Sequence, residues 1–308
     1  MTEAEYVVFD HKRDALYDPL ELLTVVNPET GETLDVTIAK SYAVSGGEHA
    51  KNLQLILARN EHDTRLMYAA RVYLSKKRVV GFMGGHSLKR DSEGYLSCAR
   101  IARAFTRLGF VVLTGGGPGA MEAAALGAYF AGMEDSKLDG AIRILSKASS
   151  HLDKDWLARA LDVVLEFPRS KDDCEKYPSL GIATWLYASE PTNIFSTKVA
   201  KIFQNSVRED FLANHTSHGV VFLQGSFGTF QEMFMVAAAV HYNFSQAPMA
   251  FFGTQFWTES VGLYPLLQQL SSKYGWSKRV SIHDDEQGLV KAVAAASHAQ
   301  SITEKSNL

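Results

Sequence analysis

The chain contains little cysteine, with only Cys98 and Cys174 in 308 residues. The two lie far apart in ordinary contexts, which favours separate thiols in a reducing compartment over a disulfide. The ten histidines also lack metal-ligand spacing, because the sequence has neither an H-E-x-x-H motif nor a Cys/His cluster. We therefore expect no metal site.

Positive charge is not in excess either. Lysine and arginine total 31 against 34 acidic residues, a net charge of −3, and the isoelectric point is about 6.4. This balance gives no global attraction to nucleic acid or to an anionic membrane. No apolar run approaches the ~18 residues of a membrane span, and the acidic N-terminal segment lacks the pattern of a signal peptide. We expect a cytoplasmic protein with no nucleic-acid or membrane partner.

Apolar residues make up 46% of the chain, a fraction typical of a globular protein with a substantial core. Residues 1–75 carry no motif linked to chemistry. Short apolar stretches at 6–9 and 36–39 predict strands, and apolar spacing over 48–74 predicts one or two amphipathic helices. We expect 1–75 to be an N-terminal extension that covers the core or contributes a dimer contact.

From residue 76 onward, predicted strands and helices alternate. The predicted strands are 79–83, 110–114, 141–145, 163–167, 219–223, 249–252 and 279–282, and the predicted helices are about 94–108, 120–131, 192–214, 229–240, 261–274 and 286–296. A short helix is also predicted around Trp156. The section between 167 and 191 is predicted to be irregular. This alternation predicts an α/β fold: a doubly wound, Rossmann-like parallel sheet over 76–300. A polar tail, 301–308, follows.

Three predicted strands are followed by loops of glycine and other small residues. The loops are Gly84-Gly85-His86-Ser87, Gly115-Gly116-Gly117-Pro118-Gly119 (followed by Ala120-Met121) and Gly225-Ser226-Phe227-Gly228-Thr229. Ligands of such sheets bind at the carboxyl ends of the strands, where these loops gather. The third loop leads into a helix, whose free N–H groups and positive dipole end favour an anion such as phosphate.

Glu232 lies one turn inside the helix that follows the third loop. A carboxylate beside a phosphate site suggests chemistry on a phosphorylated molecule. However, Thr229 and Glu232 also match a T-x-x-E capping box, in which the glutamate only satisfies a backbone N–H group. Arg208 could likewise be an ordinary solvated helix residue. His86 and His241 could be polar loop or core residues and not catalysts. The residues alone leave these alternatives open.

The second loop fits the pattern G-x-G-x-x-A, which is typical of dinucleotide binding. That function also needs an acidic residue at the end of the next strand, and the predicted strand 141–145 ends without one. A nicotinamide or flavin oxidoreductase is therefore one alternative, and a turn that only allows close helix packing is another. We favour contact with a mononucleotide.

Residues 115–123, GGGPGAMEA, resemble the G-G-G-x-G-x-M-E-A element of the LOG (Lonely Guy) phosphoribohydrolase superfamily, whose members were often labelled possible lysine decarboxylases. Residues 225–232 resemble its P-G-G-x-G-T-x-x-E element, and 84–87 lie where its first small-residue loop falls. Arg208 matches an arginine that precedes the P-G-G turn. The resemblance covers about residues 76–300. Its length makes the chain more similar to the larger nucleotide 5′-monophosphate nucleosidases.

The resemblance implies hydrolysis of the N-glycosidic bond of a nucleoside 5′-monophosphate to free base and ribose 5-phosphate, with no organic cofactor, in a homodimer or higher homo-oligomer. It implies catalytic roles for Glu232 and Arg208, phosphate binding by the third loop, and ribose and base binding by Gly84, Gly85, His86, Ser87, Gly115, Gly116, Gly117, Gly119 and Met121. A lysine decarboxylase would need pyridoxal phosphate and a Schiff-base lysine, for which the sequence offers no site.

The chain departs from the family pattern at three positions. Gln224 replaces the proline, Ser226 replaces the second glycine, and Glu209 stands where lysine usually follows the arginine. The alternative function is therefore a nucleotide-sensing module that binds without hydrolysis.

Overall fold

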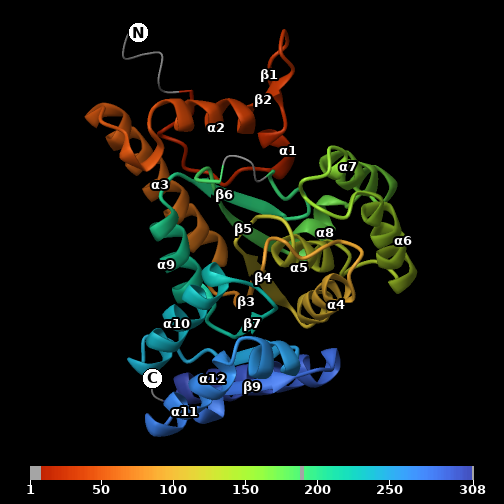
Figure 1. The fold of residues 1–308 in the computed structure, drawn as a ribbon, viewed down its shortest axis with the longest axis vertical. Helices are drawn as coiled ribbons and strands as arrows, with labels where there is room; N and C mark the ends of the chain where they lie inside the picture. The colour runs from red at the N-terminus through yellow and green to blue at the C-terminus, as the bar shows by residue number, and fades with distance from the viewer. Residues whose placement is uncertain (1–7, 188–190, 307–308) are drawn as a thin grey trace.

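A computed structural model describes residues 8–187 and 191–306. Seven strands form one sheet in the order β6-β5-β4-β3-β7-β8-β9, and every neighbouring pair is parallel (Figure 1). Their bounds are β3 (Arg78–Met83), β4 (Phe110–Thr114), β5 (Ser179–Thr184), β6 (Lys198–Ile202), β7 (Val220–Phe222), β8 (Met249–Phe252) and β9 (Val280–His283). The chain starts at β3, moves outward to β6 and returns to β7 on the other side of β3. This is the predicted doubly wound, Rossmann-like α/β fold.

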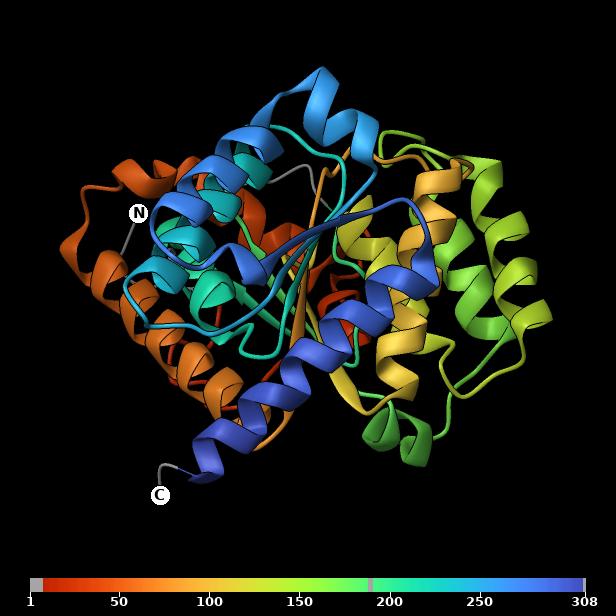
Figure 2. The same ribbon diagram turned by 90° about the horizontal axis from the view of Figure 1, so that it is seen from below.

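Helices cover both faces of the sheet, as Figure 2 shows. One face is covered by α4 (Glu93–Arg107), α5 (Ala120–Tyr129) and α12 (Glu286–Ser306), with α6 (Asp135–Leu145) and α7 (Trp156–Glu166) beyond them; the other by α3 (Leu53–Leu74), α9 (Asn205–His215), α10 (Phe227–His241) and α11 (Leu263–Lys273). Successive strand residues enter opposite cores, as Val79 and Val80 do. Burial on both faces explains why these strands are continuously apolar.

The N-terminal segment packs on the β6 side of the sheet. It contains α1 (Pro19–Leu22), β1 (Val25–Asn27), β2 (Glu32–Thr33), α2 (Leu34–Val44), η2 (Gly47–His49) and α3. Tyr17 pairs with Val199 through two backbone hydrogen bonds of 2.8 and 3.0 Å, and this bridge occupies the edge that β6 would otherwise expose. Asp63 on α3 accepts the backbone N–H groups of Phe203 and Gln204. The segment and the sheet therefore share one apolar core.

Three predicted strands are wrong because they are helical. Residues 36–39 lie in α2, 141–145 in α6 and 163–167 largely in α7. Each is a short apolar run, and such a run does not distinguish a strand from the buried side of a helix. In α7 the buried residues are Trp156, Ala160 and Val163, which is the spacing of a helix. In the stretch 6–9, residues 6 and 7 lie outside the described residues, and Phe9 packs in the core without forming a strand.

The predicted helix 192–214 is also wrong in its first half, which contains β6; only α9 is helical. The section called irregular contains β5, a strand rich in small residues, together with α8 (Lys171–Lys176). The remaining short helices are η3 (Ser146–Ala148), η4 (Phe256–Ser260) and η5 (Ser277–Arg279). The last helix, α12, continues to Ser306, through most of the segment expected to be a tail. Within the described residues, no helix is long and apolar enough to cross a membrane.

Candidate functional site

The three small-residue loops meet at the carboxyl ends of β3, β4 and β7. The N–H group of Gly85 donates to the Gln224 carbonyl at 2.8 Å, and the Gly85 carbonyl accepts from the N–H group of Ala120 at 3.1 Å. The first loop is thus held between the other two. The chain reverses its winding direction between β3 and β7, and ligands of doubly wound folds bind at such a switch point.

The second loop needs glycine for close approach. Gly119 has a φ of +69°, and a Cβ atom there would lie 2.4 Å from the Gly85 carbonyl oxygen. A Cβ atom on Gly115 would lie 2.1 Å from Nη2 of Arg208. The glycines of this loop are buried. They lie beneath the site and let its parts come together.

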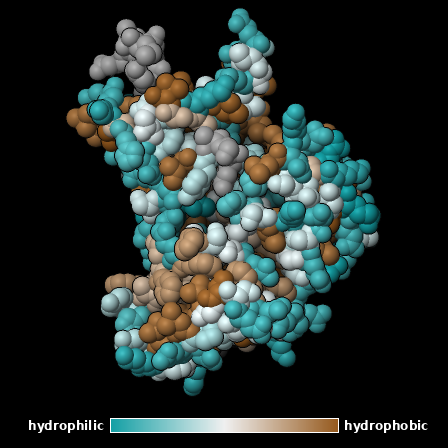
Figure 3. Space-filling view, viewed as in Figure 1, coloured by the Kyte–Doolittle hydropathy of each residue, from teal (hydrophilic) through white to brown (hydrophobic). Residues whose placement is uncertain are grey.

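A cleft of about 380 Å³ opens above these loops. It is lined by Gly84, Gly85, His86, Met121, His151, Tyr187, Arg208, Glu209, Ser226, Gly228, Thr229 and Glu232. Nine of these are predicted site residues. The predicted residues that do not line it are Ser87, Gly115, Gly116, Gly117, Gly119, Gly225 and Phe227. In Figure 3 the surface is hollowed beside the N-terminal end of α10, where hydrophobic side chains gather.

Three residues of the cleft, His151, Tyr187 and Glu209, are not among those predicted from the sequence. His151 lies in the loop before α7, and its ring meets that of His86 edge-to-face at 5.6 Å. Tyr187 follows β5. Both lie in segments predicted to have no regular structure, and nothing in the sequence placed those segments near the glycine loops. Glu209 carried a signal, because it adjoins Arg208.

The N-terminus of α10 opens on the cleft. Ser226 is the N-cap residue, but its side chain makes no capping hydrogen bond. The first helical hydrogen bond runs from the N–H group of Phe230 to the Ser226 carbonyl, which leaves the N–H groups of 227–229 free of helix partners. Thr229 lies inside the helix and is not its N-cap. The capping-box interpretation of Thr229 and Glu232 is therefore wrong.

Glu232 is a partly buried carboxyl group without a direct partner. It forms no hydrogen bond or ion pair with any residue in the described part of the chain. Burial raises its pKa from 4.5 to about 7; Arg208 lowers the pKa and Glu209 raises it further. A carboxyl group with a pKa near neutrality is suited to exchange protons in a reaction.

Arg208 is buried, and its donors are directed mainly at backbone carbonyls. Nε–H donates to Ile182 at 2.7 Å, Nη2 donates to Gly115 at 3.0 Å, and Nη1 contacts Oδ1 of Asn205 at 3.4 Å. The side chain thereby ties β5 and the second loop to α9. Although its charge lowers the pKa of Glu232, Arg208 does not hold Glu232 by direct contact.

Glu209 places a second carboxylate in the cleft. One oxygen accepts from Nδ2 of Asn205 at 2.6 Å, and the other accepts from Nε2 of Gln231 at 2.5 Å. Two amide donors thus fix its orientation. Among the described residues, no group of three or more His, Cys, Asp and Glu side chains could hold a metal ion.

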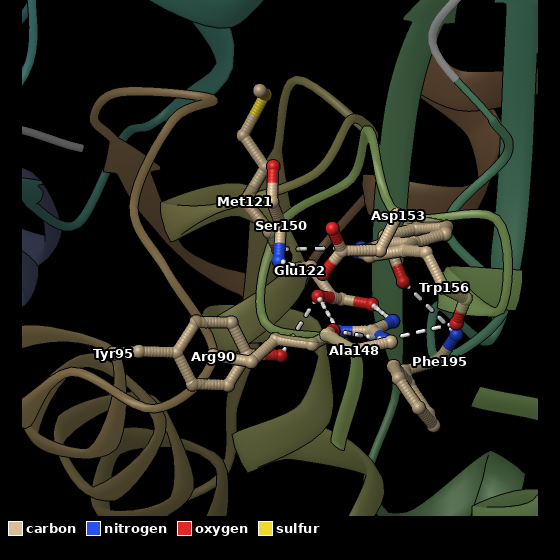
Figure 4. A network of polar contacts seen from close by, with 10 residues as sticks. Arg90, Tyr95, Met121, Glu122, Ala148, Ser150, Asp153, Trp156 and Phe195 are labelled. Atoms are coloured by element: carbon tan, nitrogen blue, oxygen red, sulfur yellow. Dashed lines mark hydrogen bonds and ion pairs between the residues drawn. The ribbon is translucent and has the colours of Figure 1, made fainter. Parts of the chain in front are cut away.

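A buried ion pair supports the cleft from below (Figure 4). Arg90 contacts both oxygens of Glu122, through Nε at 2.9 Å and Nη2 at 2.5 Å, and both side chains are 1% exposed. The Tyr95 hydroxyl donates to the same carboxylate at 2.9 Å, and Arg90 also donates to the Trp156 carbonyl at 2.8 Å. In Figure 4, Met121 projects away from this network. The network joins the segment after β3, the first turn of α5 and the start of α7; neither ion-pair residue was singled out from the sequence.

The strand on which dinucleotide binding depends differs from the predicted one. The strand that follows β4 is β5, since 141–145 is helical. It ends at Thr184, and the residues from Trp185 to Tyr187 include no carboxylate. An acidic ribose ligand is therefore absent from the described residues at this strand end.

No protein-family model and no curated protein sequence matches this chain. Among solved structures, it is similar to the molybdenum cofactor carrier protein from Chlamydomonas reinhardtii, with a TM-score of 0.46 and 16% sequence identity, over 72% of this chain and 98% of that one. The strand order and the uniformly parallel pairing define the Rossmann-like fold.

Proposed function

We propose that the cleft hydrolyses the N-glycosidic bond of a nucleoside 5′-monophosphate, releasing the free base and ribose 5-phosphate. One observation carries this proposal: Glu232, whose pKa is about 7, lines the same cleft as the uncapped N-terminus of α10. The resemblance to LOG phosphoribohydrolases supports it, because parts of all the matching segments line this cleft.

The phosphate is the part of the substrate that α10 would bind. Its oxygens would accept hydrogen bonds from the N–H groups of 227–229 and from the Thr229 hydroxyl. Its charge is also favoured by the positive end of the helix dipole. The phosphate in turn fixes the ribose at a constant distance from Glu232, five residues into the helix.

The reaction breaks the bond between C1′ and the base nitrogen, and the bonding electrons leave with the base. Positive charge develops on the sugar ring, as in glycoside hydrolysis. Ionised Glu232 stabilises that charge and accepts a proton from the water whose oxygen bonds to C1′. One proton passes to the departing base nitrogen, and Glu232 releases the proton it accepted, so that one water is added across the broken bond and Glu232 is ionised again. Arg208 acts as a positioning residue, because its N–H groups fix the second loop.

The departures at Gln224 and Ser226 are compatible with this site. Gln224 contributes its backbone carbonyl to the loop contact with Gly85, and its side chain lines a separate cavity with Gly253 and Asp284. Ser226 acts as the N-cap through its backbone carbonyl. The anion site is built from backbone N–H groups, which neither substitution removes.

A second candidate, nucleotide sensing without hydrolysis, is favoured by Glu209. Its carboxylate adds negative charge to the cleft and raises the pKa of Glu232, so less of the ionised form is present at neutral pH. Incubation with AMP, GMP, IMP, CMP and UMP separates the two functions. We expect free base and ribose 5-phosphate in equal amounts from at least one nucleotide. Tight binding without released base would favour the sensor.

A further inference from the structure

A second cavity adjoins the cleft. Its volume is about 280 Å³, and it is lined by Asp35, Val36, Ala39, His151, Asp153, Lys154, Trp156, Leu157, Trp185, Tyr187, Pro191 and Lys201. His151 and Tyr187 line both cavities. The two hollows therefore adjoin at these two residues, at the carboxyl side of the sheet.

The N-terminal segment forms part of the second cavity. Asp35, Val36 and Ala39 all belong to α2, which Figure 1 places beside the β6 end of the sheet. Residues outside the predicted nucleotide-binding region thus line a cavity that adjoins the candidate site.

A buried polar network fixes α2 in this position. Nζ of Lys201 on β6 lies 2.7 and 2.9 Å from the two carboxylate oxygens of Asp35. The same carboxylate accepts from Nε1 of Trp185 at 2.8 Å and from the Thr192 hydroxyl at 2.6 Å. Each Asp35 oxygen thus has two donors. The network positions the cavity wall, and other groups are left to contact a ligand.

Those other groups suit a flat heteroaromatic ring. Trp156, Tyr187 and His151 supply aromatic rings, and the exposed side chains of Asp153 and Lys154 supply charge at the rim. Planar rings pack well on aromatic side chains, and polar rim groups can bond to ring nitrogens and exocyclic groups. Ligand pockets usually measure about 300–1,000 Å³. The second cavity, at about 280 Å³, is slightly smaller than that range, and the cleft, at about 380 Å³, is near its lower limit. Both together are large enough for a mononucleotide.

We propose that the second cavity holds the base of the nucleotide whose ribose 5-phosphate occupies the cleft, so that α2 forms part of the substrate site. This proposal rests on the proposed function. It assigns the N-terminal segment a role in base recognition, with His151 and Tyr187 at the junction of sugar and base.

The test compares two substitutions on one helix. Val36 lines the cavity and is 42% exposed, whereas Val44, the last residue of α2, is 81% exposed and does not line it. Val36→Trp should fill the cavity, and Val44→Trp is the matched control. Both are made in a Glu232→Gln background, which prevents turnover, and thermal melting verifies that both fold. Calorimetry then measures binding of the five nucleoside monophosphates and of ribose 5-phosphate, which lacks a base.

We expect Val36→Trp to weaken nucleotide binding by about tenfold relative to Val44→Trp, and to change ribose 5-phosphate binding by less than about twofold. Unchanged nucleotide binding, or an equal loss for both ligands, would overturn the base-site proposal while leaving the proposed function intact. If the control binds neither nucleotide nor ribose 5-phosphate, the proposed function is wrong and the base site is wrong with it.

Discussion

Two arginine–glutamate combinations lie within the same part of this fold, and they are arranged in opposite ways. Arg90 and Glu122 face each other in the interior, with two close contacts. Tyr95 also donates to the glutamate, and the arginine also donates to the Trp156 carbonyl. Arg208 and Glu232 line the cleft together, but the arginine donates to carbonyls and the glutamate has no direct partner among the described residues.

We expect this difference to separate a structural carboxylate from a reactive one. In a buried ion pair, removing one partner leaves an uncompensated buried charge. A carboxylate that is desolvated without a partner has a raised pKa and can exchange protons near neutral pH. We therefore expect Glu122 to stabilise the fold and Glu232 to take part in the reaction.

We expect the largest loss of stability when the buried ion pair between Arg90 and Glu122 is broken. Glu122→Ala leaves the Arg90 guanidinium buried without its counter-ion, so we expect it to lower the free energy of unfolding by about 3–5 kcal/mol. Urea denaturation measures this. The control is Glu61→Ala, which removes the exposed helix pair with Arg65 and should cost less than about 1 kcal/mol. Equal small losses in both variants would show that the buried pair is not structural.

Glu232→Gln should raise the free energy of unfolding, whereas Glu122→Ala lowers it. The folded pKa of about 7 lies above the usual value of 4.5, so ionising Glu232 opposes folding as pH rises from 4.5 to 7. The penalty is complete above pH 7 and absent below 4.5. After discounting for the remaining solvent exposure, we expect Gln to stabilise the protein by about 2 kcal/mol at pH 8. The variant should match the wild type at pH 4.5. A gain independent of pH would contradict the raised pKa.

We expect the smallest effect from substitution of Glu209, the carboxylate that lies near Glu232 in the cleft. Glu209 raises the pKa of Glu232, so Glu209→Gln should lower that pKa without removing the carboxyl group. If ionised Glu232 is the active form, the rising acidic limb of the pH–rate profile should move to lower pH. Asp210→Asn, one residue further on, is the control and should leave the limb in place. A limb that moves upward would contradict the assignment.

The sequence was sufficient for the fold class and for the three loops, because each loop follows an apolar strand and contains unmistakable small residues. It was not sufficient for 141–145 and 163–167, whose apolar runs fit either a strand or one side of a helix. The position of His151 depends on how α6 and α7 pack, and that of Tyr187 depends on where β5 lies in the sheet. No local sequence pattern predicts either. The choice between a capping box and a free carboxyl group at Glu232 depends on where α10 begins, at Phe227, two residues before Thr229.

The most direct test of the central claim is ribose 5-phosphate release by the wild-type protein and by Glu232→Gln, measured together with free base on the nucleotide turned over fastest. We expect equimolar products from the wild type and none from the variant, while the variant still binds the nucleotide. Turnover by Glu232→Gln at the wild-type rate would contradict this claim.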